Sequence, residues 1–352
     1  MVLSDTEALD LLEGLVRIPS LSTQEEQAVA WLVERMADLG FQAERDTAGN
    51  AVGVRGAGPH QIVLLGHIDT VPGDIPVRRE DGKLYGRGSV DAKGPLATFV
   101  AAAARAQLPA DWQVVVVGAV EEEAASSKGA HYAATRYQPD MCVIGEPSHW
   151  DRVTLGYKGR LLIHYRLRQP MSHTAGKNPG APEIAVEFWN RLAGWCAAFN
   201  QGRPRAFDQA LPSLRHIRSD SDGLYDSLTM TIGVRLPLDL APETLADAVT
   251  SWAGEASLTF TGHEAAYRAE KNTPLVRGFV QAIRSLGGTP AFKDKTGTSD
   301  MNVVGPRWRC PIVAYGPGDS ALDHTPDEHL ALDEYLRAVE VLSLVLEALG
   351  PS

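Results

Sequence analysis

The chain has 352 residues, of which 44% are hydrophobic and 22% are charged, and its formal net charge is −11 at pH 7. This is the composition of an ordinary globular protein of about two domains, and it excludes a disordered or fibrous chain. An acidic chain of this kind is not expected to bind nucleic acid, which would need a basic patch.

The sequence shows no pattern for export or for a membrane. The segment 1–40 alternates charged and apolar residues with a helical period and lacks the basic start and long apolar core of a signal peptide. No run reaches the roughly 18 apolar residues that a membrane span needs. We therefore expect a cytoplasmic protein. Its three cysteines, Cys142, Cys196 and Cys310, lack CxxC spacing, which favours buried thiols over disulfides or a zinc ribbon.

Helices and strands alternate through the first part of the chain. The predicted elements cover 6–16, a helix that starts near Thr23, 62–65, 95–106, 114–120 and 142–145. Thr23 is a candidate helix cap because Glu26 follows three residues later, and Pro95 suits the start of a helix. The alternation up to about Pro147 predicts a mostly parallel sheet with helices on its faces.

The pattern then changes and later returns. Strand-like 153–167 is followed by an apolar helix over 182–199, a polar segment rich in Asp and Ser, a strand over 228–237, a helix over 242–255 and a strand over 257–261. This predicts a β-α-β-β-α-β, ferredoxin-like block. We therefore expect an α/β protein whose larger domain, 1–152 and 270–352, contains an inserted α+β domain, 153–269.

A His-x-Asp pair, His67 and Asp69, follows the apolar run 62–65. A neutral imidazole is a good zinc ligand, and a carboxylate two residues later can fix the orientation of its ring. Taken alone, a His-x-Asp pair in a chain with 10 histidines is more often a surface or capping pair than a metal site. Other motifs in the sequence favour the metal site over the surface or capping role.

More carboxylates and a second histidine follow other predicted strands and turns. They are Asp91 after the glycine-rich turn 85–90, Glu121, Glu122 and Glu123 after the strand 114–120, Glu146 after 142–145, and His324 after Tyr315 and Gly316. Open α/β sheets place their sites at strand ends. The glutamate triplet is either a solvated acidic turn or the neighbour of a dication, which would offset the mutual repulsion.

The residue types favour a hydrolytic metal site. Nitrogen and oxygen ligands suit zinc, cobalt or manganese, and they differ from the thiolates of structural zinc sites. If one carboxylate bridges two ions, one His and one Glu for each ion complete the protein ligands and leave open positions for water and substrate.

The order of these motifs, from Leu12 to about Leu330, resembles the M20 family of co-catalytic zinc aminoacylases and peptidases. The resemblance implies two divalent ions per subunit, zinc in the first place and cobalt as the alternative. It implies that His67 binds one ion, that Asp91 bridges both, and that Glu146 and His324 each bind one. Asp69 would orient His67.

The glutamate triplet leaves two registers open. The family has Asp-Glu-Glu, whose first Glu is the general base and whose second is a metal ligand. Aligning Glu121 with the Asp makes Glu122 the base and Glu123 the ligand, whereas the alternative shifts both roles back by one residue. The chain also departs from the family where Asp323 precedes His324 in place of the usual Ala, and this leaves the role of Asp323 open.

The inserted segment resembles the lid and dimerisation domain of the family, which implies a homodimer. By this resemblance, His173 helps to stabilise the tetrahedral oxyanion, and Arg235 binds a substrate carboxylate with its planar guanidinium. Gly297 lies in 295–301, which is similar to a substrate loop. A loop-exposed histidine and an ordinary strand-surface arginine are the simpler interpretations of His173 and Arg235.

The local sequences 120–123, 156–159 and 295–302 are similar to one subgroup of the family. These hydrolases release lysine, and sometimes ornithine, from the C-terminal glutamate side chain of a small acidic amino-group carrier protein in lysine and arginine biosynthesis. A basic rim for such a carrier would comprise Arg160, Arg166, Arg168, Lys177, Arg203 and Arg205. The alternatives are an N-acetylornithine deacetylase, a succinyl-diaminopimelate desuccinylase, a dipeptidase, or a metal-free binding protein.

Overall fold

The computed structural model describes residues 3–171, 173 and 178–350. They form two compact units. Unit 1 comprises Met1–Gly156, Ala269–Asp294 and Ser299–Ser352, and unit 2 comprises Tyr157–Arg268 with Lys295–Thr298. Unit 2 overlaps the segment 153–269 in which the sequence predicts an insertion. Among the helices of the described residues, none has the length and apolar character needed to cross a membrane.

Unit 1 is built on a mixed sheet. The order of its strands is β1 (Gln42–Arg45), β2 (Ala51–Gly56), β6 (Trp112–Ala119), β3 (His60–His67), β7 (Met141–Gly145), β15 (Ile312–Tyr315) and β8 (Arg152–Tyr157), and β14 (Ala291–Lys295) pairs with β8. The central strands β6, β3, β7 and β15 run parallel to one another, whereas β2 meets β6 and β8 meets β15 in antiparallel fashion. A separate small sheet contains β4 (Arg78–Glu80), β5 (Lys83–Tyr85) and β16 (His329–Ala331).

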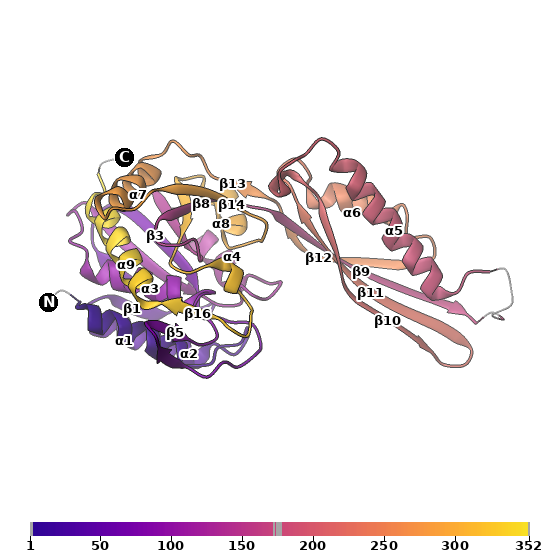
Figure 1. The fold of residues 1–352 in the computed structure, drawn as a ribbon, viewed down its shortest axis with the longest axis horizontal. Coiled ribbons are helices and arrows are strands. Elements are labelled where there is room, and N and C mark those ends of the chain that lie inside the picture. The colour runs from indigo at the N-terminus through magenta and orange to yellow at the C-terminus, as the bar shows by residue number, and fades with distance from the viewer. Residues whose placement is uncertain (1–2, 172, 174–177, 351–352) are drawn as a thin grey trace. The chain divides into compact units, whose positions relative to one another are not determined.

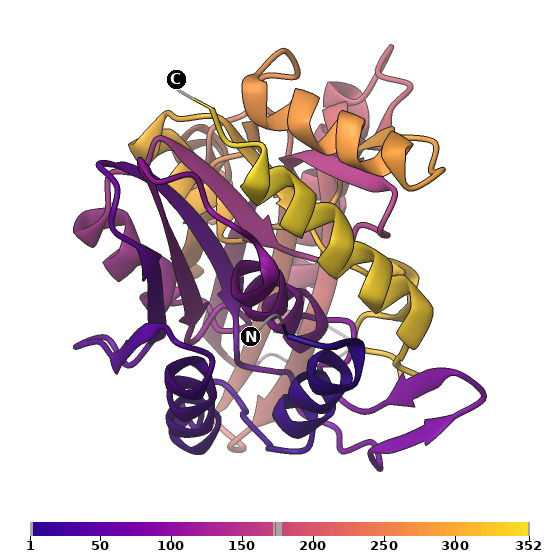
Figure 2. The same cartoon turned by 90° about the vertical axis from the view of Figure 1, so that its left-hand side faces the viewer.

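Helices cover both faces of this sheet, as the α/β prediction requires (Figure 1). The main core lies against α1 (Asp5–Val16), α2 (Glu26–Asp38), α3 (Lys93–Arg105), α7 (Pro274–Ser285) and α9 (Leu332–Glu347). In Figure 2, α9 (yellow) crosses the view above the indigo helices of the N-terminal segment. On the other face, α4 (Lys128–Arg136) contacts β6, and α8 (Met301–Trp308) contacts β15.

The central strands are buried on both faces. Ile62 and Leu64 join the main core, whereas the alternate residues Val63 and Leu65 are buried outside it. This is the consequence of side chains that alternate across a doubly covered sheet.

The predicted cap at Thr23 is wrong. The helix α2 begins at Glu26, its N-cap is Glu25, and no side chain caps it. Thr23 has a φ of 72° and donates its N–H to Glu25 Oε1, so it belongs to the turn before the helix. A capping box is present instead at Ser4 and Glu7, where α1 starts. The three cysteines are free thiols; Cys142 and Cys196 are buried as predicted, whereas Cys310 is only partly buried.

Unit 2 is a four-stranded antiparallel sheet with helices. Its elements are β9 (Gly159–Pro170), α5 (Ala181–Phe199), the short helix η1 (Ala206–Asp208), β10 (Leu211–Ser221), β11 (Tyr225–Leu236), α6 (Pro242–Thr250), β12 (Ser257–Glu264) and β13 (Tyr267–Arg268). The sheet order β10-β11-β9-β12 and the chain order β-α-β-β-α-β are ferredoxin-like. β10 lies in the segment that the sequence shows only as polar. Most of its residues are exposed, so buried and exposed side chains do not alternate along it and no strand pattern appears.

Candidate metal centre

The parallel strands of unit 1 end together. Gly66 at the end of β3 lies beside Gly118 of β6 and Gly145 of β7, and Gly145 lies beside Tyr315 of β15. The residues that follow these strands therefore emerge at one edge of the sheet. They include His67, the glutamate triplet, Glu146 and the loop that leads through the short helix η2 (Ser320–Leu322) to His324.

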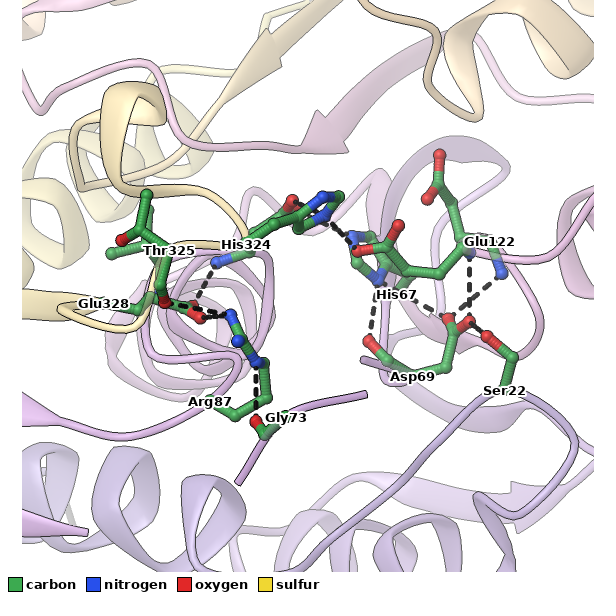
Figure 3. Close-up of polar contacts among 12 residues, drawn as sticks. Ser22, His67, Asp69, Gly73, Arg87, Glu122, His324, Thr325 and Glu328 are labelled. Carbon is green, nitrogen blue, oxygen red and sulfur yellow. Dashed lines mark hydrogen bonds and ion pairs between the residues drawn. The ribbon is translucent and has the colours of Figure 1, made fainter. Parts of the chain in front are cut away.

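Asp91 lies between two imidazoles. Its Oδ1 is 3.2 Å from His67 Nε2, and its Oδ2 is 3.1 Å from His324 Nε2. His324 Nε2 is also 2.9 Å from Oε1 of Glu123 (Figure 3). Ligand atoms of His67, Asp91 and Glu123 lie within 4.8 Å of one another. A carboxylate that offers one oxygen to each side is the arrangement that bridging of two ions requires.

The turn that carries Asp91 is held by a residue from the other end of the chain. The backbone N–H groups of Val90 and Asp91 donate to Glu328 Oε1 at 3.0 and 3.1 Å. Glu328 is fully buried, and its Oε2 is 2.7 Å from the Arg87 guanidinium. Sequence reasoning gave no role to Glu328 or Arg87. The available signal was one charged residue of opposite sign in each of two predicted site segments: Arg87 in the glycine-rich turn and Glu328 close after His324.

Asp69 is completely buried and joins the ring of His67 to the glutamate turn. It accepts hydrogen bonds from Ser22 Oγ at 2.7 Å and from the backbone N–H groups of Glu122 and Glu123 at 3.0 Å each (Figure 3). His67 Nδ1 lies 3.1 Å from the Asp69 carbonyl and 3.5 Å from its Oδ1. Burial acts to raise the pKa of Asp69, but the contacts with His67 and these donors hold it below its ordinary value.

The three glutamates point to different partners. Glu121, with a φ of 60°, accepts a hydrogen bond from Ser126 Oγ at 2.7 Å and lies 3.5 Å from Lys128. Glu123 reaches His324. The carboxylate of Glu122 points away from Asp69, to which its backbone N–H donates (Figure 3). This divergence favours the register with Glu122 as base and Glu123 as ligand.

Glu122 has the electrostatic character of a proton carrier. Burial raises the pKa of its carboxyl group well above the usual value, and the nearby charges of Asp300, Glu146 and Glu123 add to the rise against the opposing effect of His67. A carboxyl group with a raised pKa is suited to accept and return a proton.

The acidic surroundings favour positive charge at the centre of the cluster. Although burial opposes it, Asp69 and Asp91 raise the pKa of His67 well above its ordinary value. Hydrogen bonds with Asp91 and Glu123 raise the pKa of His324 to about 10. The negative potential that retains protons on these imidazoles would also stabilise a dication bound in place of those protons. The oxygen and nitrogen donors of this set fit a divalent metal.

Two further carboxylates lie near the cluster. Glu146 directly follows β7, is buried, and acts electrostatically on Glu122. Asp300 precedes α8, is 2% exposed, and has its pKa raised to about 7 by burial. The sequence analysis placed the loop 295–301 at the site without assigning a role to Asp300; a lone carboxylate among small residues was the available signal.

The remaining predicted residues belong to unit 2. Arg235 Nη1 donates to Thr298 Oγ1 at 2.9 Å, so Arg235 contacts the loop that contains Gly297. A Cβ added to Gly297 would meet no atom within 4 Å, so packing does not require a glycine there. His173 is exposed, and its neighbours 172 and 174–177 lie outside the described residues. The roles of Arg235, Gly297 and His173 stay predictions.

The chain is similar to known proteins over nearly its whole length. The chain is 51% identical over 352 residues to a [LysW]-lysine hydrolase of Deinococcus radiodurans, with 97% of each chain covered. It is 41% identical to a putative [LysW]-lysine/[LysW]-ornithine hydrolase of Thermococcus kodakarensis, covering 99% of this chain and 94% of the relative.

Solved structures share the fold at low sequence identity. A tripeptidase from Staphylococcus aureus superposes with a TM-score of 0.81 at 19% identity, with 99% of each chain covered. A dinuclear metal-binding M20 peptidase from Bacillus subtilis has a TM-score of 0.70 at 14% identity and covers 97% of each chain. Residues 63–348 match the model of peptidase family M20/M25/M40. Because this match covers most of the chain, the chain belongs to peptidase family M20/M25/M40, and its sheet and its clustered candidate ligands are consistent with that family.

Proposed function

We propose that this protein is a two-zinc amidohydrolase that releases lysine, with ornithine as a second substrate, from the C-terminal glutamate side chain of an acidic amino-group carrier protein. The observation that carries the proposal is the 51% identity, over nearly the full length of both chains, to a [LysW]-lysine hydrolase. We take LysW to be a carrier of this kind. The released amino acid would serve lysine or arginine biosynthesis in the cytoplasm.

The ligand assignment follows the contacts of the cluster. We assign His67 and Glu146 to one ion, Glu123 and His324 to the other, and Asp91 to both. The 2.9 Å contact between Glu123 and His324 supports their pairing. Divalent ions bound here would lower the pKa of water and polarise the scissile carbonyl. Zinc is proposed, with cobalt as the alternative that the same donors accept.

The protein side chains then move the proton and hold the substrate. Glu122 accepts a proton from the attacking water and delivers it to the leaving amine. Asp69 keeps His67 oriented and fixes the backbone of the turn on which Glu122 sits. In unit 2, we assign Arg235 and Gly297 to substrate binding and His173 to the oxyanion.

The basic rim is smaller than the sequence indicates. Four of its members have acidic partners: Arg160 with Glu264, Arg168 with Asp222, Arg203 with Asp239, and Arg205 with Asp208. Lys177 lies outside the described residues. Arg166 is exposed and has no acidic partner within the described part of the chain, so it is the rim residue that we expect an acidic carrier to contact.

A homodimer through unit 2 is part of the proposal. The edge strand β10 is largely exposed, and Leu214 and Ile217 on it are 40% and 44% exposed. Leu224, in the turn that follows, is 74% exposed. An unpaired edge with apolar side chains is a surface on which a second copy of the sheet can pair. Sedimentation of the purified protein tests this directly: a dimer is expected, and a monomer at micromolar concentration would remove this part of the proposal.

The deciding experiment compares substrates. The zinc- or cobalt-loaded protein is incubated with lysine-charged carrier, N-acetylornithine, succinyl-diaminopimelate and a dipeptide, and the released amino acid is measured. We expect the highest kcat/KM with the charged carrier. A preference for a free acylated amino acid or a dipeptide would instead make the protein a deacylase or a dipeptidase and remove the carrier.

A charge reversal separates carrier recognition from chemistry. Arg166→Glu should raise KM for the charged carrier and leave the hydrolysis of a small acyl-lysine unchanged. Arg284→Glu, at another exposed arginine, on α7, is the control and should change neither. Equal losses on both substrates in Arg166→Glu would show that Arg166 does not read the carrier.

A further inference from the structure

A small polar cavity of about 190 Å³ lies on the sheet of unit 2. Its wall includes Arg160 and Leu162 of β9, Gly233 and Arg235 of β11, and Arg215 of β10. Alternate residues of β9 and β11 join the core of unit 2 with α5 and α6, so the cavity lies on the opposite face of the sheet. Within the described chain, no carboxylate lines it. The cavity is therefore basic, although the chain as a whole is acidic.

Arg215 reaches this cavity because of an irregularity in β10. The register between β10 and β11 shifts between Leu214 and His216, so Arg215 is an extra residue in its strand. A bulge of this kind can re-aim a side chain. The stem of Arg215 lies over Gly233, since a Cβ built on this glycine would be 3.2 Å from Arg215 Cδ. The bulge and the glycine together bring the Arg215 side chain onto the wall of the cavity.

The three arginines of the cavity differ in the partners that the fold gives them. Arg160 donates to both carboxylate oxygens of Glu264, at 3.1 and 3.0 Å, so its charge is balanced within unit 2. Arg235 donates an N–H to the neutral hydroxyl of Thr298. Arg215 is exposed, and no acidic side chain in the described part of the chain pairs with it. The cavity thus keeps a positive charge that an anionic oxygen can neutralise.

The proposed substrate brings two carboxylates to the scissile amide. Because this amide is formed by the side chain of a C-terminal glutamate, the α-carboxylate at the end of the carrier stays free. The lysine or ornithine on the other side of the amide keeps its own carboxylate. Arg235 has been assigned to one substrate carboxylate, so the other still needs a cation. Arg215 can supply it.

We propose that Arg215 binds the free α-carboxylate of the carrier's C-terminal glutamate in this cavity, while Arg235 holds the carboxylate of the amino acid that is released. This assignment rests on the proposed function and names the recognition element for the end of the carrier. The guanidinium of Arg215 meets a carboxylate with two parallel hydrogen bonds, which an amide cannot accept. Arg215 therefore selects a carrier that ends at the charged glutamate over a protein whose chain continues beyond it.

The exposure of the two arginines favours this order. Arg215 is exposed on β10, where a carrier protein can approach, whereas Arg235 is only partly exposed and contacts the loop with Gly297. The smaller half of the substrate suits the less exposed arginine. Pairing of a second copy along the edge of β10 uses backbone groups and leaves this face of the sheet open.

The test compares lysine-charged carrier with the same charged carrier whose terminal α-carboxylate has been converted to an amide. The metal-loaded wild type should hydrolyse the amide with a kcat/KM about tenfold lower, mainly through KM. Arg215→Met keeps an aliphatic stem and removes the guanidinium. It should lose about tenfold on the carboxylate form and nothing further on the amide. Arg215→Lys, which keeps the charge, should fall between the wild type and Arg215→Met.

Two controls separate this recognition from the chemistry. Arg218→Met, at another exposed arginine of β10, should keep the full preference for the carboxylate. A small acyl-lysine, which has no glutamate carboxylate, should be hydrolysed equally by the wild type and Arg215→Met. Equal hydrolysis of the two carriers by the wild type, or an unchanged preference in Arg215→Met, would overturn the assignment and leave the hydrolase standing. If the wild type releases no lysine from either carrier, the proposed function fails and the assignment fails with it.

Discussion

Replacing Asp69 with asparagine should damage both the stability and the metal affinity of unit 1. Oδ1 of Asp69 accepts the N–H of Glu122, and Oδ2 accepts the N–H of Glu123 and the hydroxyl of Ser22. An asparagine has one acceptor oxygen, so in either orientation its NH₂ group faces a buried backbone N–H. One buried donor without an acceptor, together with the lost charge, costs about 2–3 kcal/mol of unfolding free energy.

The same substitution removes the carboxylate beside His67 Nδ1. Loss of such an orienting partner typically lowers metal affinity by about 10–100-fold. Chemical denaturation of the metal-free protein measures the first effect, and competition with a chromogenic chelator measures the second. Asp46→Asn is the matched control, because Asp46 Oδ1 accepts three backbone N–H groups and Oδ2 accepts Asn50 Nδ2, so the NH₂ group of an asparagine would again face a donor, in a turn of unit 1 with no direct contact to the cluster. We expect Asp46→Asn to lose stability and keep metal affinity. Unchanged metal affinity in Asp69→Asn would refute the orienting role.

Three further sets of variants test other parts of the structure. Glu122→Gln should keep its metal and lose about 10²–10⁴-fold in kcat, as expected for loss of a general base; Glu123→Gln should lose metal on dialysis, and Glu121→Gln should keep both metal and turnover. Loss of turnover in Glu121→Gln, together with loss of metal in Glu122→Gln, would favour the other register. Burial raises the pKa of Glu25 above its usual value of 4.5. Between that value and its raised pKa the folded state binds more protons than the unfolded state, so this carboxylate lowers stability as pH rises through that interval. The backbone N–H groups of Thr23 and Glu121 both donate to Oε1 of Glu25, so Glu25→Gln can keep these hydrogen bonds. The variant should have a higher melting temperature than the wild type at pH 7 and lose this advantage below pH of about 4. A lower melting temperature at pH 7 would contradict the linkage between the raised pKa and stability. Gly297→Ala should leave the melting temperature unchanged because its Cβ meets no atom, and it should raise KM if substrate approaches this loop; a loss of stability would assign the glycine to packing.

The part of the fold that sequence reasoning predicted is the part whose side chains follow a simple period. The apolar runs of β3, β6 and β7 are buried on both faces, so they stand out as strands, and their ends indicate where His67, Glu123 and Glu146 lie. The strand β10 has no buried face and therefore no period, so its residues look like a loop. Its pairing with β11 is a property of the sheet and cannot be seen in its own residues.

The supporting residues of the site were harder to predict because their role depends on contacts far along the chain. Glu328 acts on Asp91 through backbone N–H groups 237 positions earlier. Ser22 donates its hydroxyl to the carboxylate of Asp69, 47 positions later in the chain. Neither residue has a motif of its own. The basic rim shows a different limit of sequence reasoning. Its arginines can be recognised in the sequence, but only the structure shows that acidic side chains pair with them, as Asp239 does with Arg203.

The position of β15 has a consequence for biosynthesis of the chain. This strand lies between β7 and β8 in the sheet but is made about 150 residues after them, because residues 157–268 of unit 2 are made in between. Until residues 312–315 leave the ribosome, β7 and β8 lack their common neighbour and each presents an unpaired edge, which is prone to pair with other chains. His324 follows later still, so the nascent chain has no complete ligand set for most of its synthesis. Unit 2, whose sheet is nearly contiguous in sequence, can fold during this interval. We expect insertion of this late strand into the middle of an early sheet to be the slow step in folding of unit 1.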